Sequence, residues 1–251
     1  MPDELVHYAV SDAVATITLD SQHNRNALSQ QLVSELGARL ERADADGEVR
    51  VALIRQEGKV FCSGADLSEA TTVGMEEGAR RIVALQRLIT AMDKPVVTRV
   101  VGAVRAGGIG IVAASDVAVS ADDATYALTE VKLGLAAAII SLTVHARMNP
   151  RAAALATLGG EVFTGEQAAA YGLVSRAVPV DDLDRAVAEV CARLATGTPQ
   201  GLRESKRILN ADLVRRIDDA GEDMAALSAR LFASDEARAA MTAFLDRKRT
   251  R

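Results

Sequence analysis

The sequence predicts a mixed α/β domain over residues 1–180, followed by a purely helical region over residues 181–251. Two observations predict this division. Up to residue 180, short strand-like runs occur between helical patterns, which is typical of layered α/β domains. From residue 181 onward, the apolar residues recur at helical spacing. We therefore expect an α/β core with a helical appendage that begins just after Pro179.

The first part of the chain predicts two strands, a helix and a third strand. Residues 6–10 and 15–19 alternate in hydrophobicity around a turn at residues 11–12, which indicates a hairpin with one buried face. Ser29 is suited to cap a helix, because leucines at helical spacing follow it. Residues 49–55 are again strand-like.

The middle of the chain contains two glycine-rich turns, each after a predicted strand and before a predicted helix. The first turn covers residues 58–67, and a helix is expected at 76–92. A single β-branched strand is expected at 96–104, and it runs into the second turn at 106–110. Further strands are expected at 116–120, 125–128 and 173–178, with helix starts at Asn149-Pro150 and at the capping box Thr164 to Gln167.

Composition excludes several classes of protein. The chain has 251 residues, of which 49% are hydrophobic and 25% charged, as in ordinary globular proteins. A net charge of −5 and 3% aromatic residues argue against a nucleic-acid-binding surface. Two cysteines cannot form a disulfide framework, and three scattered histidines argue against a metal site. The acidic N-terminus and the short uncharged runs predict a cytoplasmic protein that has no membrane span.

The two glycine-rich turns have the features of an oxyanion hole. Amides at the start of a helix lack intrahelical partners and carry partial positive charge. Two such donors aimed at one point stabilise the oxygen of an enolate. The small residues at 63–65 and 106–108 would let a ligand approach the backbone, although two ordinary tight turns would give the same pattern.

Glu130 is the candidate acid/base group near these turns. It lies between an apolar strand and a segment of small residues, and its pKa would rise if it were desolvated. The alternative is an exposed glutamate at a helix start. Asp66 is suited to cap a helix, and Cys62 is expected to be a buried structural thiol, because no histidine is near it in the sequence.

Residues 108–113 also match the G-x-G-x-x-A fingerprint of dinucleotide-binding proteins. A nucleotide-binding fold needs a full crossover helix after that motif. Only residues 111–115 are available before the next predicted strand, so this match is weak.

Taken together, the motifs resemble those of the enoyl-CoA hydratase/isomerase, or crotonase, superfamily. The resemblance covers nearly the whole chain. It rests on the ordered segments Asn24 to Leu28, Phe61 to Leu67, Lys94 to Gly108, Thr129 to Leu135 and Phe163 to Pro179. It implies a crotonase-like spiral of ββα repeats and a C-terminal helical region used for assembly into a trimer or a dimer of trimers.

The resemblance also implies roles for particular residues. The two oxyanion amides fall on Ala65 and Gly107, and the catalytic glutamate falls on Glu130. The substrate would be an acyl-CoA thioester, with no cofactor besides the CoA of the substrate. The residues that would contact substrate or CoA are Arg25, Ala27, Ser63, Gly64, Asp66, Leu67, Gly108 and Lys248.

Two departures from the family pattern bear on the reaction. Hydratases with two carboxylates carry a second glutamate where this chain has Gly110, and many relatives have a Pro-Gly-Gly-rich stretch where it has Ala136 to Ser141. Hydration is the commonest activity of the family that the chain resembles, so we expect an enoyl-CoA hydratase, and Gly110 leaves Glu130 as its single catalytic glutamate. The alternatives are a Δ3,Δ2-enoyl-CoA isomerase using the same glutamate, and a catalytically weak acyl-CoA-binding protein.

Overall fold

The computed structural model describes residues 3–66, 69 and 75–249, with the backbone alone for Met75 and residues 244–249. The strands are β1 Val6–Ser11, β2 Val14–Leu19, β3 Val51–Gln56, β4 Val60–Cys62, β5 Val96–Val100, β6 Ala103–Arg105, β7 Val117–Ala121, β8 Thr125–Ala127, β9 Phe163–Thr164 and β10 Arg176–Val178. The α-helices are α1 Gln30–Ala45, α2 Met75–Ala91, α3 Gly107–Ala114, α4 Ala138–Arg147, α5 Pro150–Gly159, α6 Gly165–Ala170, α7 Val180–Ala195, α8 Pro199–Phe232 and α9 Asp235–Arg249. Two 3₁₀ helices, η1 Gln22–Asn24 and η2 Glu130–Leu133, complete the elements.

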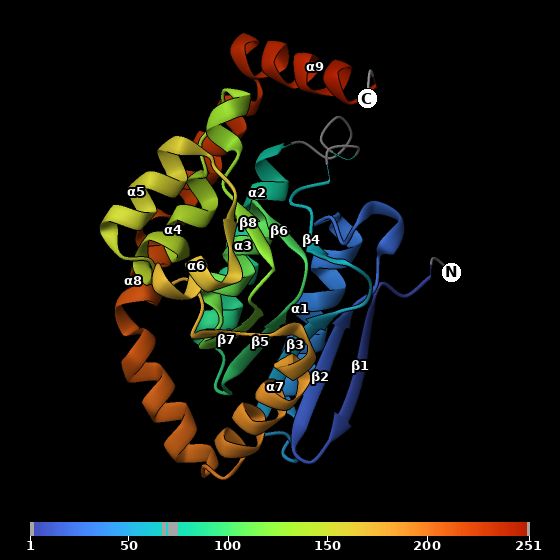
Figure 1. Cartoon of the computed structure of the whole chain (residues 1–251). Coiled ribbons are helices and arrows are strands. Elements are labelled where there is room, and N and C mark those ends of the chain that lie inside the picture. Colours follow the sequence, from blue (N-terminus) through green and yellow to red (C-terminus); the bar gives the residue numbers. More distant parts are fainter. Residues whose placement is uncertain (1–2, 67–68, 70–74, 250–251) are drawn as a thin grey trace.

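The strands form two sheets (Figure 1). The larger sheet has the order β1-β2-β3-β5-β7-β10, and all its pairs are parallel except β1 with β2. The smaller sheet has the order β4-β6-β8-β9, and β4, β6 and β8 run parallel. One continuous apolar core packs between these layers and their helices.

The chain repeats one simple unit. Strands β3 and β4, then β5 and β6, then β7 and β8 each place one strand in the larger sheet and the next in the smaller sheet. Each pair is followed by helical structure, so the successive units wind as a spiral of ββα repeats. The expected fold class is confirmed.

The strand expected at residues 96–104 is in fact two strands, and that expectation was wrong. The chain turns at Gly102, which has a φ of +74° and separates β5 from β6. A side chain at this glycine would begin 1.9 Å from the carbonyl oxygen of Lys59, so the backbones pass too closely for any other residue. This turn moves the chain from the larger sheet to the smaller one.

The predicted hairpin is present, but only its second strand is buried as expected. In β2, Ala15, Ile17 and Leu19 are fully buried, whereas Val10 of β1 is 43% exposed. The difference arises because β1 is the edge strand of the larger sheet. The expected caps are also confirmed, since Ser29 accepts a hydrogen bond from the Leu32 amide and Thr164 forms a capping box with Gln167.

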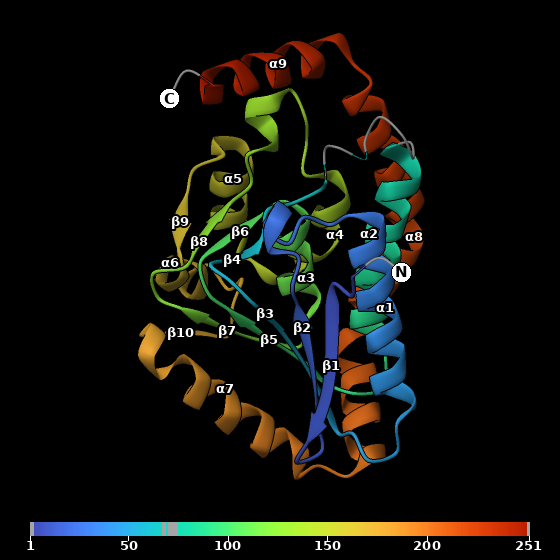
Figure 2. The ribbon, with the colours of Figure 1, turned by 90° about the vertical axis from the view of Figure 1, so that its right-hand side faces the viewer.

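The C-terminal region is helical, as expected. Helix α7 packs on the larger sheet, and the long helix α8 packs on α2 and α4 (Figures 1 and 2). Helix α9 packs on η2, where Ala237 is fully buried. A separate domain boundary at residue 180 remains a prediction.

Candidate active site

Three turns that contain the predicted site residues follow three neighbouring strands. Cys62 of β4 pairs with Val104 of β6, which in turn pairs with Tyr126 of β8. Ala65 comes three residues after Cys62, and Gly107 comes three residues after Val104. Glu130 comes four residues after Tyr126. Because parallel strands end at the same edge of a sheet, the three turns lie together at the carboxyl edge of the smaller sheet (Figure 2).

The first turn is held by the loop that precedes α1. The Ser63 amide donates to the carbonyl oxygen of Arg25 at 3.1 Å, and the Ser63 hydroxyl donates to that of Asn24 at 3.0 Å. The Leu28 amide donates to the carbonyl oxygen of Gly64 at 2.8 Å. These bonds link two segments that the sequence analysis could only place separately.

The second turn touches the first. Gly64 has a φ of +99°, and a side chain there would begin 3.0 Å from the Cβ of Ala106. Ala106 itself has a φ of +46° and precedes the first residue of α3, Gly107. A side chain on Gly107 would begin 2.5 Å from Cδ1 of Leu28. The backbones at this corner are therefore packed to the limit that glycine permits.

The backbone amides of Ala65 and Gly107 are unengaged. Within the described chain, neither amide donates a hydrogen bond to another group. For Gly107 the reason is its place at the first position of a helix, where an amide has no intrahelical acceptor. Two unpaired donors on adjoining turns are a suitable receptor for an anionic oxygen.

Glu130, at the first position of η2, is intermediate in burial rather than exposed, so the exposed alternative is wrong. Its Oε2 atom is buried and has no hydrogen-bond partner among the residues that the structure describes. Burial raises the pKa of the Glu130 carboxyl, and a hydrogen bond from its own amide opposes that rise. A carboxyl group in this state is suited to exchange a proton with a ligand.

Cys62 is fully buried, as expected. Burial raises the pKa of its thiol to about 12, so the thiol stays protonated at neutral pH. The Sγ atom accepts a hydrogen bond from the Gly64 amide at 3.4 Å. A side chain on Gly108 would begin 2.5 Å from the Cβ of Cys62, so this glycine packs against the core side of the turn.

Only some of the other residues that were predicted to contact substrate lie near the two turns. Arg25 is exposed, with a φ of +61°, and Ala27 is buried beside it. The Asp66 carboxylate accepts a hydrogen bond from the Asn24 side chain at 3.0 Å, and the helix cap expected of Asp66 depends on following residues that lie outside the described ones. Leu67 lies outside the described residues, and Lys248 is described only as backbone within α9.

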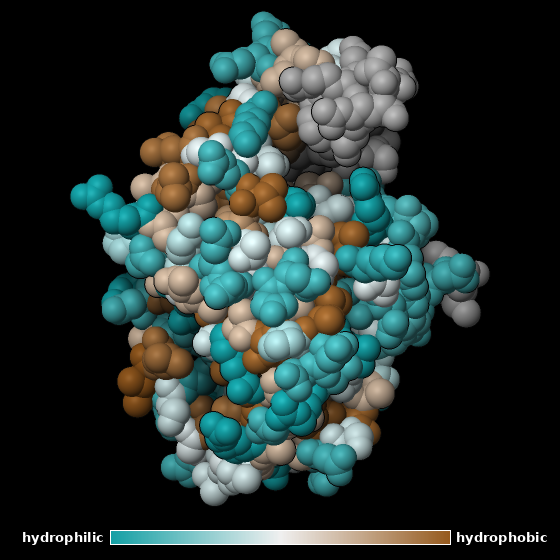
Figure 3. Space-filling view, in the orientation of Figure 1, coloured by the Kyte–Doolittle hydropathy of each residue, from teal (hydrophilic) through white to brown (hydrophobic). Residues whose placement is uncertain are grey.

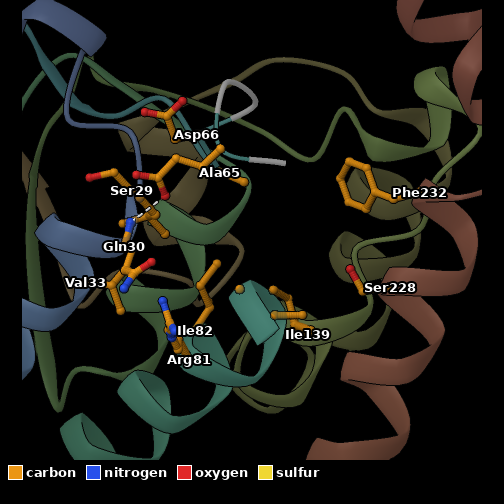
Figure 4. Close-up of a pocket in the computed structure, with 14 residues that line it drawn as sticks. Ser29, Gln30, Val33, Ala65, Asp66, Arg81, Ile82, Ile139, Ser228 and Phe232 are labelled. Atoms are coloured by element: carbon orange, nitrogen blue, oxygen red, sulfur yellow. Dashed lines mark hydrogen bonds between the residues drawn. The ribbon is translucent and has the colours of Figure 1, made fainter. Parts of the chain in front are cut away.

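A small pocket of about 80 Å³ opens beside Ala65 (Figure 4). Gly107 lies behind Leu28, one of the lining residues, and Glu130 is not among them. Figure 4 shows Phe232 and Ser228 of α8 facing Ala65 across the cavity. No sequence pattern pointed to these two residues, because their approach depends on how α8 packs. Ile139 also lines the pocket, and it belongs to the segment Ala136 to Ser141 that departs from the family pattern.

Gly110 lies against the packing between α2 and α4. A side chain there would begin 2.7 Å from Cγ2 of Ile140 and 3.0 Å from Oε1 of Gln86. Gln86 is fully buried, and its Oε1 accepts from the Thr143 hydroxyl at 2.7 Å. The space that a second glutamate at position 110 would need is therefore filled by the side chains of Ile140 and Gln86.

The described residues show neither a metal-binding cluster nor a membrane-spanning helix. They contain no group of three or more histidine, cysteine, aspartate or glutamate side chains arranged to hold a metal ion. They also contain no helix that is long and apolar enough to cross a membrane.

The two sheets linked by successive ββα units define a spiral class of α/β proteins, and in this chain the turns with Ala65, Gly107 and Glu130 follow neighbouring strands of the smaller sheet. The sequence profile described as enoyl-CoA hydratase/isomerase matches residues 9–251. The chain belongs to the enoyl-CoA hydratase/isomerase family and has the crotonase fold.

Solved and curated relatives agree with this assignment. An enoyl-CoA hydratase from Mycobacterium avium has 43% identity and a TM-score of 0.92, with 98% of this chain and 97% of that chain covered. A Bacillus subtilis protein named as a probable enoyl-CoA hydratase is 30% identical, with 97% and 96% covered. An (E)-benzylidenesuccinyl-CoA hydratase from Thauera aromatica is 30% identical, with 81% and 82% covered.

Proposed function

We propose that this chain adds water across the double bond of a 2-enoyl-CoA thioester. The observation that carries the proposal is that three turns follow neighbouring strands at one sheet edge, two with unpaired amides and one with a carboxyl group whose Oε2 atom is buried and has no partner among the described residues. Membership of the enoyl-CoA hydratase/isomerase family supports an acyl-CoA substrate.

The thioester carbonyl oxygen accepts hydrogen bonds from the amides of Ala65 and Gly107. As water attacks C3, the electrons of the double bond move toward the carbonyl and form an enolate, whose negative oxygen these amides stabilise. Loss of one such donor typically costs about 3–4 kcal/mol of transition-state stabilisation. The Glu130 carboxylate takes a proton from the attacking water and delivers a proton to C2, so the carboxylate is regenerated.

A second candidate reaction is the isomerisation of a 3-enoyl to a 2-enoyl thioester. The packing around Gly110 favours it, because that site has no room for a second carboxylate to hold water. Isomerisation needs a single base, which removes a proton from C2 and returns it to C4. The same two amides would stabilise the intermediate dienolate.

One pair of assays separates these reactions. Hydration of crotonyl-CoA removes the absorbance of the conjugated thioester, whereas isomerisation of a 3-enoyl-CoA creates it. We expect loss of absorbance with the 2-enoyl substrate. Gain with the 3-enoyl substrate and no loss with the 2-enoyl substrate would assign the isomerase. Tight binding of acyl-CoA without turnover of either substrate would instead assign a binding protein.

The CoA portion of the substrate is proposed to lie along the loop that contains Arg25. That loop is bonded directly to the Ala65 turn, and the Arg25 side chain is exposed beside it. Contributions from Ser63, Asp66, Leu67 and Lys248 belong to the same proposal.

Assembly into a homo-oligomer, as a trimer or a dimer of trimers, is also proposed. Helix α5 exposes Leu155 and Leu158, and Val162 follows it with a similarly exposed side chain. Figure 3 shows apolar side chains gathered at the upper left, over α5. Contiguous exposed apolar surface of this kind is typical of protein contacts.

A further inference from the structure

Ser228 of α8 has a hydroxyl group with no hydrogen-bond partner among the described residues, and this hydroxyl opens into the pocket (Figure 4). Its side chain is 7% exposed and lines the pocket beside Ala65. Within the described chain, this hydroxyl makes no hydrogen bond. Other helical hydroxyls bond back to the preceding turn, as Thr90 does to the Gln86 carbonyl at 2.8 Å and Thr242 to that of Arg238 at 2.9 Å.

Several of the residues that line the pocket with Ser228 are apolar. The pocket wall near it comes from Ile82, Ile139 and Phe232, and Leu28 lies toward Ala65. Figure 4 shows the oxygen of Ser228 directed into the cavity, across from Ala65. A ligand that fills the pocket takes this hydroxyl away from water, and leaving it without a hydrogen bond would then cost binding free energy. A ligand atom that bonds this hydroxyl would therefore gain affinity.

We propose that Ser228 is a specificity-determining residue that hydrogen-bonds a neutral oxygen, either a hydroxyl or a ketone, on the acyl group of the thioester substrate. The inference rests on the proposed function, because that function places the thioester carbonyl at the Ala65 amide and directs the acyl group into this pocket. The substrate class is then an oxygenated acyl-CoA rather than a plain alkyl one.

The charges around the pocket favour a neutral oxygen over a carboxylate. Asp66 and Glu69 both line it. Arg81 also lines it, but its guanidinium donates to Glu77 at 3.1 Å. Arg81 is the one cationic side chain among the described lining residues, and it is engaged with Glu77, so a carboxylate on the acyl group would find no available cation there. A serine hydroxyl can instead donate to a ketone or accept from a hydroxyl.

Phe232 limits the other side of the same subsite. It comes four residues after Ser228 on α8, so both side chains lie on one face of the helix. The aromatic ring covers apolar carbon atoms while the hydroxyl contacts the polar one. This pairing would recognise a short acyl group with one oxygen at a fixed distance from the thioester.

The test is equilibrium binding of saturated thioesters, measured by calorimetry. The ligands are hexanoyl-CoA and its hydroxylated and oxo counterparts, with the oxygen on each of the last three carbons in turn. The proteins are the wild type, Ser228→Ala and the matched control Ser205→Ala, whose hydroxyl is on the exposed face of the same helix. The hydroxylated and oxo series distinguish the two kinds of oxygen.

We expect the wild type and Ser205→Ala to bind one oxygenated thioester about 3- to 10-fold more tightly than hexanoyl-CoA, as one neutral hydrogen bond provides. Ser228→Ala should lose this preference and keep its affinity for hexanoyl-CoA. Equal wild-type affinity for every thioester, or a preference that survives in Ser228→Ala, would overturn the inference. Binding is measured without turnover, so an absence of hydratase activity is a separate result.

Discussion

The Cβ atom of Ala106 lies 3.0 Å from the point where a side chain on Gly64 would begin. The turns after β4 and β6 therefore touch, and the amides of Ala65 and Gly107 are each one residue beyond this contact. The distance between the two proposed oxyanion donors, the amides of Ala65 and Gly107, therefore depends on Gly64, which is not itself a donor to the substrate.

Replacement of Gly64 by alanine should disturb both stability and turnover. A φ of +99° is unfavourable for alanine by about 1–3 kcal/mol, and the added methyl group would press on Ala106. We expect a lower midpoint in urea unfolding and a fall in kcat larger than any change in KM. Gly47→Ala is the matched control, because no atom lies within 4 Å of the added carbon. Equal kcat for the Gly64 variant and the wild type would contradict the proposed role of this contact.

Glu130→Gln should abolish turnover of crotonyl-CoA and leave the binding of butyryl-CoA nearly unchanged. The amide preserves the shape of the side chain but cannot accept and return a proton. Turnover is measured from the absorbance of the conjugated thioester, and binding by calorimetry. Glu166→Gln, on the first turn of α6, is the control. Full activity of the Glu130 variant would remove this residue from the mechanism.

The same glutamate should make the stability of the ligand-free protein depend on pH. Burial raises the pKa of Glu130 above the ordinary value of 4.5 when the chain is folded. The stabilising effect of the protonated group is therefore fully present below that ordinary value and is lost as pH rises through the folded-state pKa. Between pH of about 4.5 and neutrality, the free energy of unfolding of the wild type should decrease relative to that of Glu130→Gln. Urea unfolding at each pH measures both free energies, and a difference between the wild type and Glu130→Gln that does not change with pH would contradict this expectation.

A buried ion pair attaches α8 to the core. Lys206 Nζ lies 2.9 Å from Oδ2 of Asp116, and both side chains are nearly inaccessible to water. The other oxygen of Asp116 accepts from Asn210 at 2.7 Å. Lys206→Met leaves a buried carboxylate without its counterion, so we expect a loss of about 3–5 kcal/mol of stability.

Chemical denaturation measures this loss, and an exposed pair on the same helix gives the comparison. Arg215 pairs with Asp212 at the surface, and Arg215→Met should change stability by less than about 1 kcal/mol. Similar small effects of both substitutions would show that the buried pair does not hold α8 in place.

Helix α5 provides the test of assembly. Leu158 is 75% exposed in the single chain, and Leu158→Glu should lower the molar mass measured by light scattering after gel filtration. Arg185→Ala, on the exposed face of α7, should leave the mass unchanged. A monomeric wild type would refute the proposed oligomer.

The local elements were largely predictable because each depends on neighbouring residues. The Ser29 cap, the Thr164 capping box and the buried face of β2 follow from side chains within a few positions. The split at Gly102 was not predictable, because it depends on the approach of Lys59, more than forty residues away in the chain.

The sequence by itself determined most of the strands and helices, the two glycine-rich turns and the family resemblance, because these are properties of local patterns and motif spacing. Only the tertiary structure decided that Ala65, Gly107 and Glu130 follow one row of paired strands, that Glu130 is desolvated, and that Ser228 faces the pocket. The physical reason is that strand register and helix packing bring distant residues together, and burial then changes the chemistry of the groups enclosed.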